Sequence, residues 1–146
     1  MRAVAVFDEV ASGTSTKTLV QVVAPSNRGV RITEFAISFK GTDNLAAPIR
    51  VELLRQTTAG TASALTPRKV SRHDSNTIQT TAQQTFTAEP TADEVVRSFL
   101  IHPQGGLVYT VPDPAQFTVA GGDRLGMRVV TPAATVNCVG YIEFEE

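Results

Sequence analysis

The sequence predicts an all-β fold, a single antiparallel β-sandwich domain that is jelly-roll-like. Three observations predict it. Short apolar runs alternate with Gly, Pro, Asn and Asp at intervals of about ten residues. Several of these runs alternate apolar and polar residues with a period of two, which is typical of strands with one buried face. No long stretch keeps the 3.6-residue period of a helix, and eight to ten short strands in one domain favour two packed sheets.

Length and composition set the class of protein. The chain has 146 residues, and we expect residues 1–146 to form one domain. Hydrophobic residues make up 42 %, enough for a core without disulfides or a metal. Thirteen basic and fourteen acidic side chains leave a net charge of -1, which argues against nucleic acid as a partner. No run approaches the roughly 20 apolar residues of a membrane span, and the N-terminus lacks a secretory pattern, so we expect synthesis in a reducing cytoplasm.

Ten segments are expected to be strands. In chain order they are Ala3–Phe7, Thr18–Ala24, Ile32–Lys40, Ile49–Arg55, Gln84–Thr87, Arg97–His102, Leu107–Val111, Gln116–Val119, Arg124–Thr131 and Val136–Phe144. Three of them alternate most clearly. Their apolar residues should face the core, namely Phe35, Ile37 and Phe39, then Ile49, Val51 and Leu53, and finally Leu125, Met127 and Val129. Glycine-containing turns such as Gly41–Asn44 separate the runs.

The stretch from Gln56 to about Glu94 differs from the rest. It is rich in Thr, Ser, Ala and Gln and poor in large apolar residues, so we expect a long Thr/Gln-rich excursion, which is typical of functional or flexible segments. Its end holds the best helix candidate. Thr91 as N-cap and Glu94 three residues later form a capping-box pattern, which predicts one or two helical turns over Thr91–Arg97.

No catalytic or cofactor motif stands out. Ser71, His73 and Asp74 are the residue types of a hydrolase triad, but close neighbours on an extended chain do not converge as a triad must. Cys138 is the only cysteine and lies in an apolar strand, so we interpret it as a buried hydrophobe rather than a nucleophile. We expect no enzyme activity and no cofactor.

Metal and sugar sites are weaker alternatives. Two histidines and one cysteine make a zinc site improbable. Asp43, Asp113 and Asp123 have oxygen ligands suited to calcium, but turn formation is their usual role. A lectin-like site would rest on Tyr109 and Tyr141, because the chain has no tryptophan to stack on a sugar ring.

The excursion carries the candidate partner-binding residues. Arg68, Lys69, Arg72 and His73 form a locally basic segment. It is either a solvated loop or a contact with an acidic protein surface. Nucleic acid is disfavoured because no aromatic residues are interleaved for base stacking.

The C-terminal third resembles a known group of proteins. Ser98–Tyr109, Arg124–Val129 and Val136–Glu146 together resemble small structural proteins of tailed bacteriophages, in particular capsid decoration (cement) proteins. The resemblance implies a β-sandwich protomer that binds the outside of an icosahedral shell, often as a trimer. It carries over no site residues. The sequence departs from one pattern of the group, because Ala3–Phe7 already reads as a strand where a disordered arm would lie.

We therefore expect a non-enzymatic virion protein, made in the host cytoplasm. It would bind the major capsid protein on the shell surface, stabilise the shell and form a homotrimer. The alternatives are a receptor- or glycan-binding β-sandwich module, such as a fibre tip, and another head or tail component. A preformed trimer would favour decoration, and sugar binding that depends on Tyr109 or Tyr141 would favour the glycan-binding module.

Overall fold

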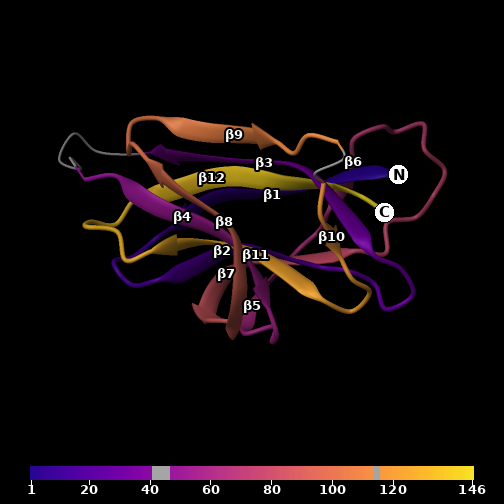
Figure 1. Ribbon diagram of the computed structural model, residues 1–146, viewed down its shortest axis with the longest axis horizontal. Coiled ribbons are helices and arrows are strands. Elements are labelled where there is room, and N and C mark those ends of the chain that lie inside the picture. The colour runs from indigo at the N-terminus through magenta and orange to yellow at the C-terminus, as the bar shows by residue number, and fades with distance from the viewer. Residues whose placement is uncertain (41–46, 114–115) are drawn as a thin grey trace.

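The computed structural model describes residues 1–40, 47–113 and 116–146. Two antiparallel sheets pack face to face (Figure 1). The described residues contain strands, turns and no helix. No helix in this part of the chain is long and apolar enough to cross a membrane.

In the described residues, twelve strands make up the two sheets. They are β1 (Arg2–Ala11), β2 (Lys17–Val23), β3 (Val30–Lys40), β4 (Ile49–Gln56), β5 (Thr61–Leu65), β6 (Arg68–Lys69), β7 (Thr81–Ala88), β8 (Ala92–Ile101), β9 (Gly106–Thr110), β10 (Thr118–Val119), β11 (Arg124–Val130) and β12 (Asn137–Glu145). All ten expected strands are therefore confirmed, with ends that shift by a few residues. The expected turn Gly41–Asn44 lies outside the described residues.

The strand order is that of a jelly roll. Sheet A contains β1, β12, β3 and β9 as neighbours, and sheet B contains β2, β11, β4 and β8. Along the chain these eight strands alternate between the sheets, except at β4 and β8, which are paired in sheet B. Two Greek keys connected in this way are the defining feature of the fold. β6 and β10 add short pieces to sheet A.

The core lies between the sheets and follows the period of two. The three alternating sets face inward as expected, and Phe39, the most exposed of the nine residues, is half-buried against the core. The largest buried side chains of sheet A are Phe7, Phe35 and Phe144. They pack against Leu125 and Met127 of sheet B in one continuous cluster. This packing fixes which face of each strand is free to meet a partner.

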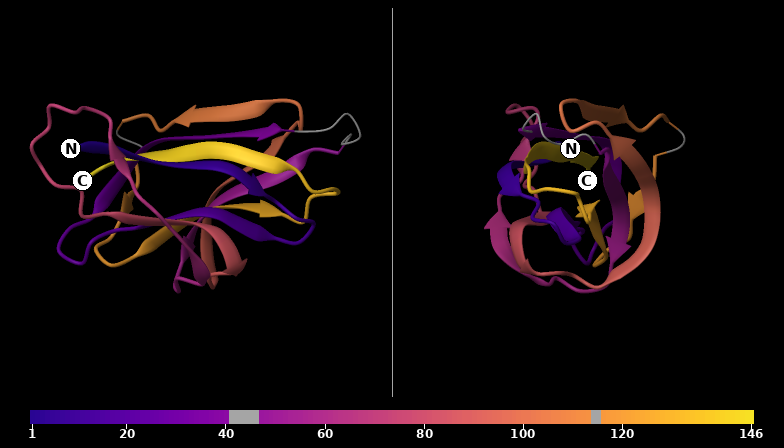
Figure 2. Two further views of the ribbon diagram at one scale, coloured as in Figure 1. Left: turned by 180° about the vertical axis from the view of Figure 1, so that it is seen from behind. Right: turned by 90° about the vertical axis from the view of Figure 1, so that its left-hand side faces the viewer.

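The Thr/Gln-rich stretch from Gln56 to Glu94 is largely built into the sheets. β5 and β7 extend sheet B beyond β2, while β6 pairs with β1. Residues 70–80 form its longest segment without a strand. β5 and β7 lie near β1 of sheet A, so the added strands partly close one side of the sandwich, which the two further views of the ribbon let the reader follow (Figure 2). The apolar residues are few because β5 is an edge strand and both β5 and β7 have a largely solvated face.

Polar side chains tie this stretch to the outer face of sheet B. Glu89 accepts hydrogen bonds from the Thr18 amide at 2.8 Å and from its hydroxyl at 2.7 Å. The Thr18 hydroxyl in turn accepts a hydrogen bond from the side-chain amide of Gln56. The side-chain amide of Gln21 donates to the Gln56 Oε1 at 2.7 Å. Thr18, Gln21 and Gln56 are buried, so the network replaces the water these groups would otherwise bind.

The expected helix over Thr91–Arg97 is wrong. This segment is the start of β8, which pairs with β4 from Ala92 to Ile101. Thr91 does not cap a helix, because its hydroxyl accepts from Thr58 and its amide donates to the Thr58 hydroxyl at 2.8 Å. The β-branched Val95 and Val96 suit a strand, and Val96 packs on the core. Tertiary pairing therefore overrides the local capping signal.

We predict that Gly140→Ala strongly destabilises the domain. Gly140 lies in β12, where an added Cβ would come 2.1 Å from the Ala36 carbonyl oxygen and 2.9 Å from the Phe7 ring. Both neighbours belong to the sheet and its core, so the free energy of unfolding should fall by about 3 kcal/mol in urea titration. Gly105→Ala is the control, because its nearest contact would be an ordinary 3.5 Å. Equal stability of the two variants would contradict the prediction.

Candidate protein-binding surface

The structure places the basic segment, Arg68, Lys69, Arg72 and His73, beside the N-terminus. β6 pairs with β1, which sets Arg68 opposite Val4 and Lys69 opposite Ala3. Arg68, Arg72 and His73 are exposed, while Lys69 is half-buried and donates from Nζ to the Asp74 carbonyl at 2.7 Å. Three of the four side chains are thus free to contact a partner, and the fourth holds the loop.

The loop that carries Arg72 and His73 is fastened at both ends. The Val70 amide donates to the Arg2 carbonyl at 3.0 Å. At the other end the Glu146 carboxylate accepts from the amides of Gln79 and Thr80, each at 2.8 Å, and from the Thr80 hydroxyl. The termini lie side by side at this end of the sandwich (Figure 1), where the Met1 ammonium donates to the Glu146 carbonyl at 2.7 Å.

These bonds change the chemistry of Glu146. Burial opposes its ionisation, but the Thr80 hydroxyl and the amides of Gln79 and Thr80 together outweigh burial and lower its pKa. The ionised carboxylate is the form that accepts all three hydrogen bonds. The position of the loop that carries Arg72 and His73 therefore depends on the negative charge of Glu146, a residue far from this loop in the sequence.

The triad-like residues do not form a triad. His73 is exposed and has no hydrogen bond to Ser71 or Asp74. Asp74 instead accepts from the Asn76 amide at 2.9 Å, and its own amide donates to the Ser71 carbonyl. These bonds form turns, which agrees with the interpretation as a polar loop.

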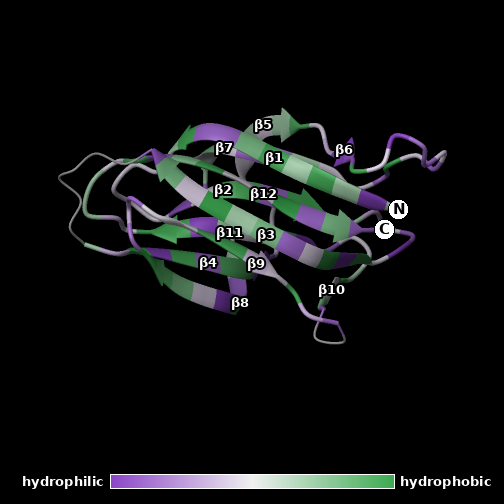
Figure 3. Ribbon diagram, turned by 90° about the horizontal axis from the view of Figure 1, so that it is seen from above, coloured by the Kyte–Doolittle hydropathy of each residue, from purple (hydrophilic) through white to green (hydrophobic). Residues whose placement is uncertain are grey.

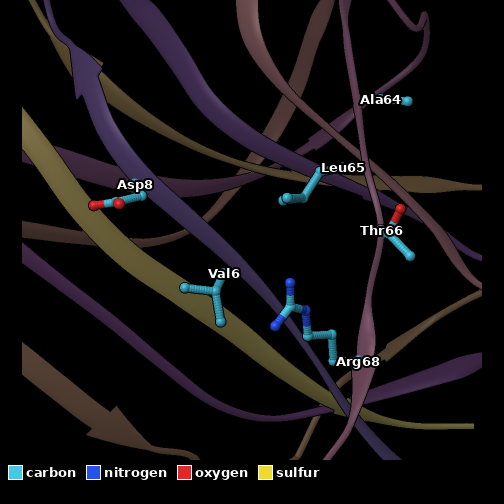
Figure 4. A pocket seen from close by; sticks show the side chains of 6 residues that line it. All are labelled: Val6, Asp8, Ala64, Leu65, Thr66 and Arg68. Carbon is cyan, nitrogen blue, oxygen red and sulfur yellow. The ribbon is translucent and has the colours of Figure 1, made fainter.

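A groove runs between the basic segment and β1. It has a volume of about 450 Å³ and is lined by Val6, Asp8, Ala64, Leu65, Thr66 and Arg68. Figure 4 shows Leu65 and Arg68 extending toward β1, which carries Val6 and Asp8. Val6, Ala64 and Leu65 therefore give the groove an apolar lining. Arg68 adds a positive charge and Asp8 a single negative charge.

The outer face of sheet A presents an apolar row next to this groove. Val6, Tyr141, Ala36 and Val108 lie directly opposite one another across β1, β12, β3 and β9, the order seen in Figure 3. Val6 is 47 % exposed and Val108 is 66 % exposed. The row forms part of a shallow hollow of about 360 Å³, and Val6 lines both this hollow and the groove.

Polar and charged groups surround the apolar row. Arg2 pairs with Glu143 and Arg31 with Glu145 toward the termini, and at the opposite end Lys40 pairs with Glu9 at 2.9 Å. These pairs satisfy one another at the surface, where each contributes little to stability. They leave the apolar centre as the unpartnered part of this face.

The Tyr141 side chain is held in place within the row. Its hydroxyl donates to Glu34, which also accepts from Thr110 at 2.7 Å. The hydrogen bond to Glu34 raises the pKa of Tyr141 to about 12, and the same bond, together with that from Thr110, lowers the pKa of Glu34. The phenol is therefore neutral and fixed at ordinary pH, which gives the row a rigid aromatic member.

An apolar centre with a polar rim is the usual anatomy of a protein interface. The basic segment stands out in the sequence as a cluster, whereas Val6 and Val108 do not. A signal was present, because Ala3–Phe7 and Leu107–Val111 carry apolar residues at both parities of the strand. Such strands are apolar on the solvent face as well as on the core face.

The tyrosines proposed for sugar stacking lie in different settings. Tyr109 faces inward and stacks on Phe35, with ring centroids 5.2 Å apart, and it also contacts Phe99. Its face is therefore occupied by the core. Tyr141 is half-exposed on the outer face of sheet A, in the row described above.

The candidate metal ligands are dispersed. Among the residues described, no three His, Cys, Asp or Glu side chains are grouped so that they could hold a metal ion. The His102 Nδ1 accepts from the Gln104 amide at 3.1 Å, which is a turn contact. Asp123 lies in the turn before β11, and Asp113 precedes residues 114–115, which are not described. Asp43 lies outside the described residues.

Comparisons of the sequence with known protein families and with curated proteins, and of the structure with solved structures, found no match.

Acid should release the loop that carries the basic segment. Because the folded pKa of Glu146 is lowered from 4.5, its stabilisation is present above that pH and is lost as pH falls through the folded value. Glu146→Gln should lower the free energy of unfolding by about 1 kcal/mol at pH 7 and have a smaller effect in acid. Urea titrations at both pH values measure this, and an effect that is independent of pH would contradict it.

The Cys138 thiol should be inert in the folded protein. It is fully buried, and burial raises its pKa to about 12. Iodoacetamide at pH 8 should leave the native protein unmodified and label it after unfolding in urea, because the thiolate is the reactive form. Mass spectrometry counts the adducts. Labelling of the native protein as fast as the unfolded chain would support the nucleophile interpretation.

Proposed function

We propose that this protein is a non-enzymatic structural protein of a phage virion that binds the outer surface of the capsid and stabilises it. Its partner is the major capsid protein, and it acts as a homotrimer without a cofactor. The resemblance of the C-terminal third to capsid decoration proteins suggests the partner. The apolar row on sheet A is the observation that carries a binding role, because Val6 and Val108 expose apolar surface at its two ends beside a shallow apolar hollow.

The positive charge of Arg68 and Arg72 supports the proposal that the partner surface on the shell is acidic. Arg68 and Arg72 are exposed and form no ion pair with any described carboxylate. Arg68 lines the groove that Val6 shares with the row, and Arg72 follows it in the loop after β6. A partner surface with an apolar centre and flanking carboxylates would complement both features.

Stabilisation of the shell follows from mass action. A protein that binds the assembled shell and not its free subunits shifts the equilibrium toward the assembled form. Each protomer needs to add only a modest interface energy, because many symmetry-related copies act on one particle. A flat binding face serves this role better than a deep pocket.

The central test is a charge placed in the row. Val108→Glu should fold normally, because Val108 is 66 % exposed, and should weaken binding to the shell at least tenfold, about 1.4 kcal/mol, by burying an unpaired carboxylate. Cosedimentation with assembled capsids of the encoding phage that lack this protein measures the affinity. Raising the salt concentration should also weaken binding through Arg68 and Arg72.

Leu100→Glu is the matched control. Leu100 is 64 % exposed on sheet B, so the same change there should leave binding unchanged. If both variants bind as the unmodified protein does, or if the unmodified protein fails to bind at micromolar concentration, the proposal is wrong. Light scattering of the unmodified protein in solution should give three times 15.6 kDa.

A further inference from the structure

A charged cleft at one end of sheet B is separate from the surface described above. It has a volume of about 290 Å³ and is lined by Arg55, Gln56, Thr57, Asp93, Gly122, Asp123 and Arg124. The end of β4, the start of β8 and the start of β11 converge there. It shares no lining residue with the groove or the hollow of sheet A.

Its two arginines form no ion pair with an acidic side chain that the structure describes. Arg2, Arg31 and Arg128 each pair with a glutamate elsewhere in the molecule. Arg55 and Arg124 form no ion pair within the described chain, and the buried Nε of Arg124 has no hydrogen-bond acceptor. The terminal nitrogens of the two guanidinium groups are therefore the donors that an acceptor in the cleft could use.

Two carboxylates lie in the same cleft and form no ion pair among residues 1–40, 47–113 and 116–146. Asp93 and Asp123 form no ion pair with Arg55 or Arg124 although all four line one space. The backbone of Asp123 is fixed, since its amide donates to Ala120 at 2.9 Å and its carbonyl accepts from Ala24 at 3.0 Å. The cleft therefore offers anion-binding donors and hydroxyl-binding acceptors at once.

The floor of the cleft is rigid. Gln56 is held by the buried network, in which it accepts from Gln21 at 2.7 Å and donates to Thr18 at 2.9 Å. Gly126 lies beneath it, where a Cβ would come 2.2 Å from the Gln56 amide oxygen. A site with a fixed floor loses less conformational freedom when it binds a ligand.

We infer that this cleft binds a sugar that carries a carboxylate, such as a uronic acid. The carboxylate would lie between Arg55 and Arg124, because guanidinium groups bind carboxylates through paired hydrogen bonds. The ring hydroxyls would donate to Asp93 and Asp123. A neutral sugar would leave the guanidinium donors unpaired, and a phosphate dianion would be repelled by the two aspartates.

An NMR titration of the labelled full-length protein tests this with D-glucuronate as the probe. Saturable shifts should appear at the amides of Thr57, Gly122 and Arg124. D-Glucose and inorganic phosphate should each bind at least tenfold more weakly. Equal affinity for glucose, equal affinity for phosphate, or no saturable shift at these amides would overturn the inference.

Variants separate the cleft from a general charge effect. Arg124→Gln should weaken glucuronate binding at least tenfold, and Asp123→Asn should weaken it while preserving the fold. Arg128→Gln is the control, because Arg128 lies on the same strand and pairs with Glu52 at 2.8 Å. Circular dichroism confirms folding of each variant. An equal loss in Arg128→Gln would contradict the assignment, and the result does not depend on whether the protein binds a capsid.

Discussion

The antiparallel pairing of β1 with β12 is the contact on which the rest of the structure depends. It joins the first strand to the last and places β12 between β1 and β3 at the centre of sheet A. That position brings Val6 and Tyr141 into one row and brings Glu146 next to the loop after β6. The apolar row and the basic segment are both consequences of this pairing, although their residues are far apart in the sequence.

Much of the fold could be predicted because its signals are local. The alternation around Phe35, Ile49 and Leu125 identifies strands and their inner faces, and the turn residues separate them. The segment Thr91–Arg97 shows the limit of local signals. Its capping pattern is real, but pairing with β4 and packing of Val96 decide its structure, and neither is visible in a short window of sequence.

The site was predictable in part for the same reason. Arg68 and Arg72 stand out as a cluster in the sequence, whereas the apolar row is formed by four strands that meet only in the folded sheet. The stretch from Gln56 to Glu94 is a related case. Its lack of large apolar residues suggested an excursion, yet hydrogen bonds among Thr18, Gln56 and Glu89 attach it to sheet B. Hydrogen bonds between polar side chains cannot be recognised from the hydropathy of the sequence.

The same first-to-last pairing has a consequence for how the chain is made. Ribosomes extend a chain by about 5–20 residues per second, so β1 exists for on the order of ten seconds before β12 emerges. During that time the inward side chains of β1, Ala5 and Phe7 among them, have no β12 beside them. A nascent chain with this connectivity leaves β1 open to chaperones and to other nascent copies until β12 has emerged.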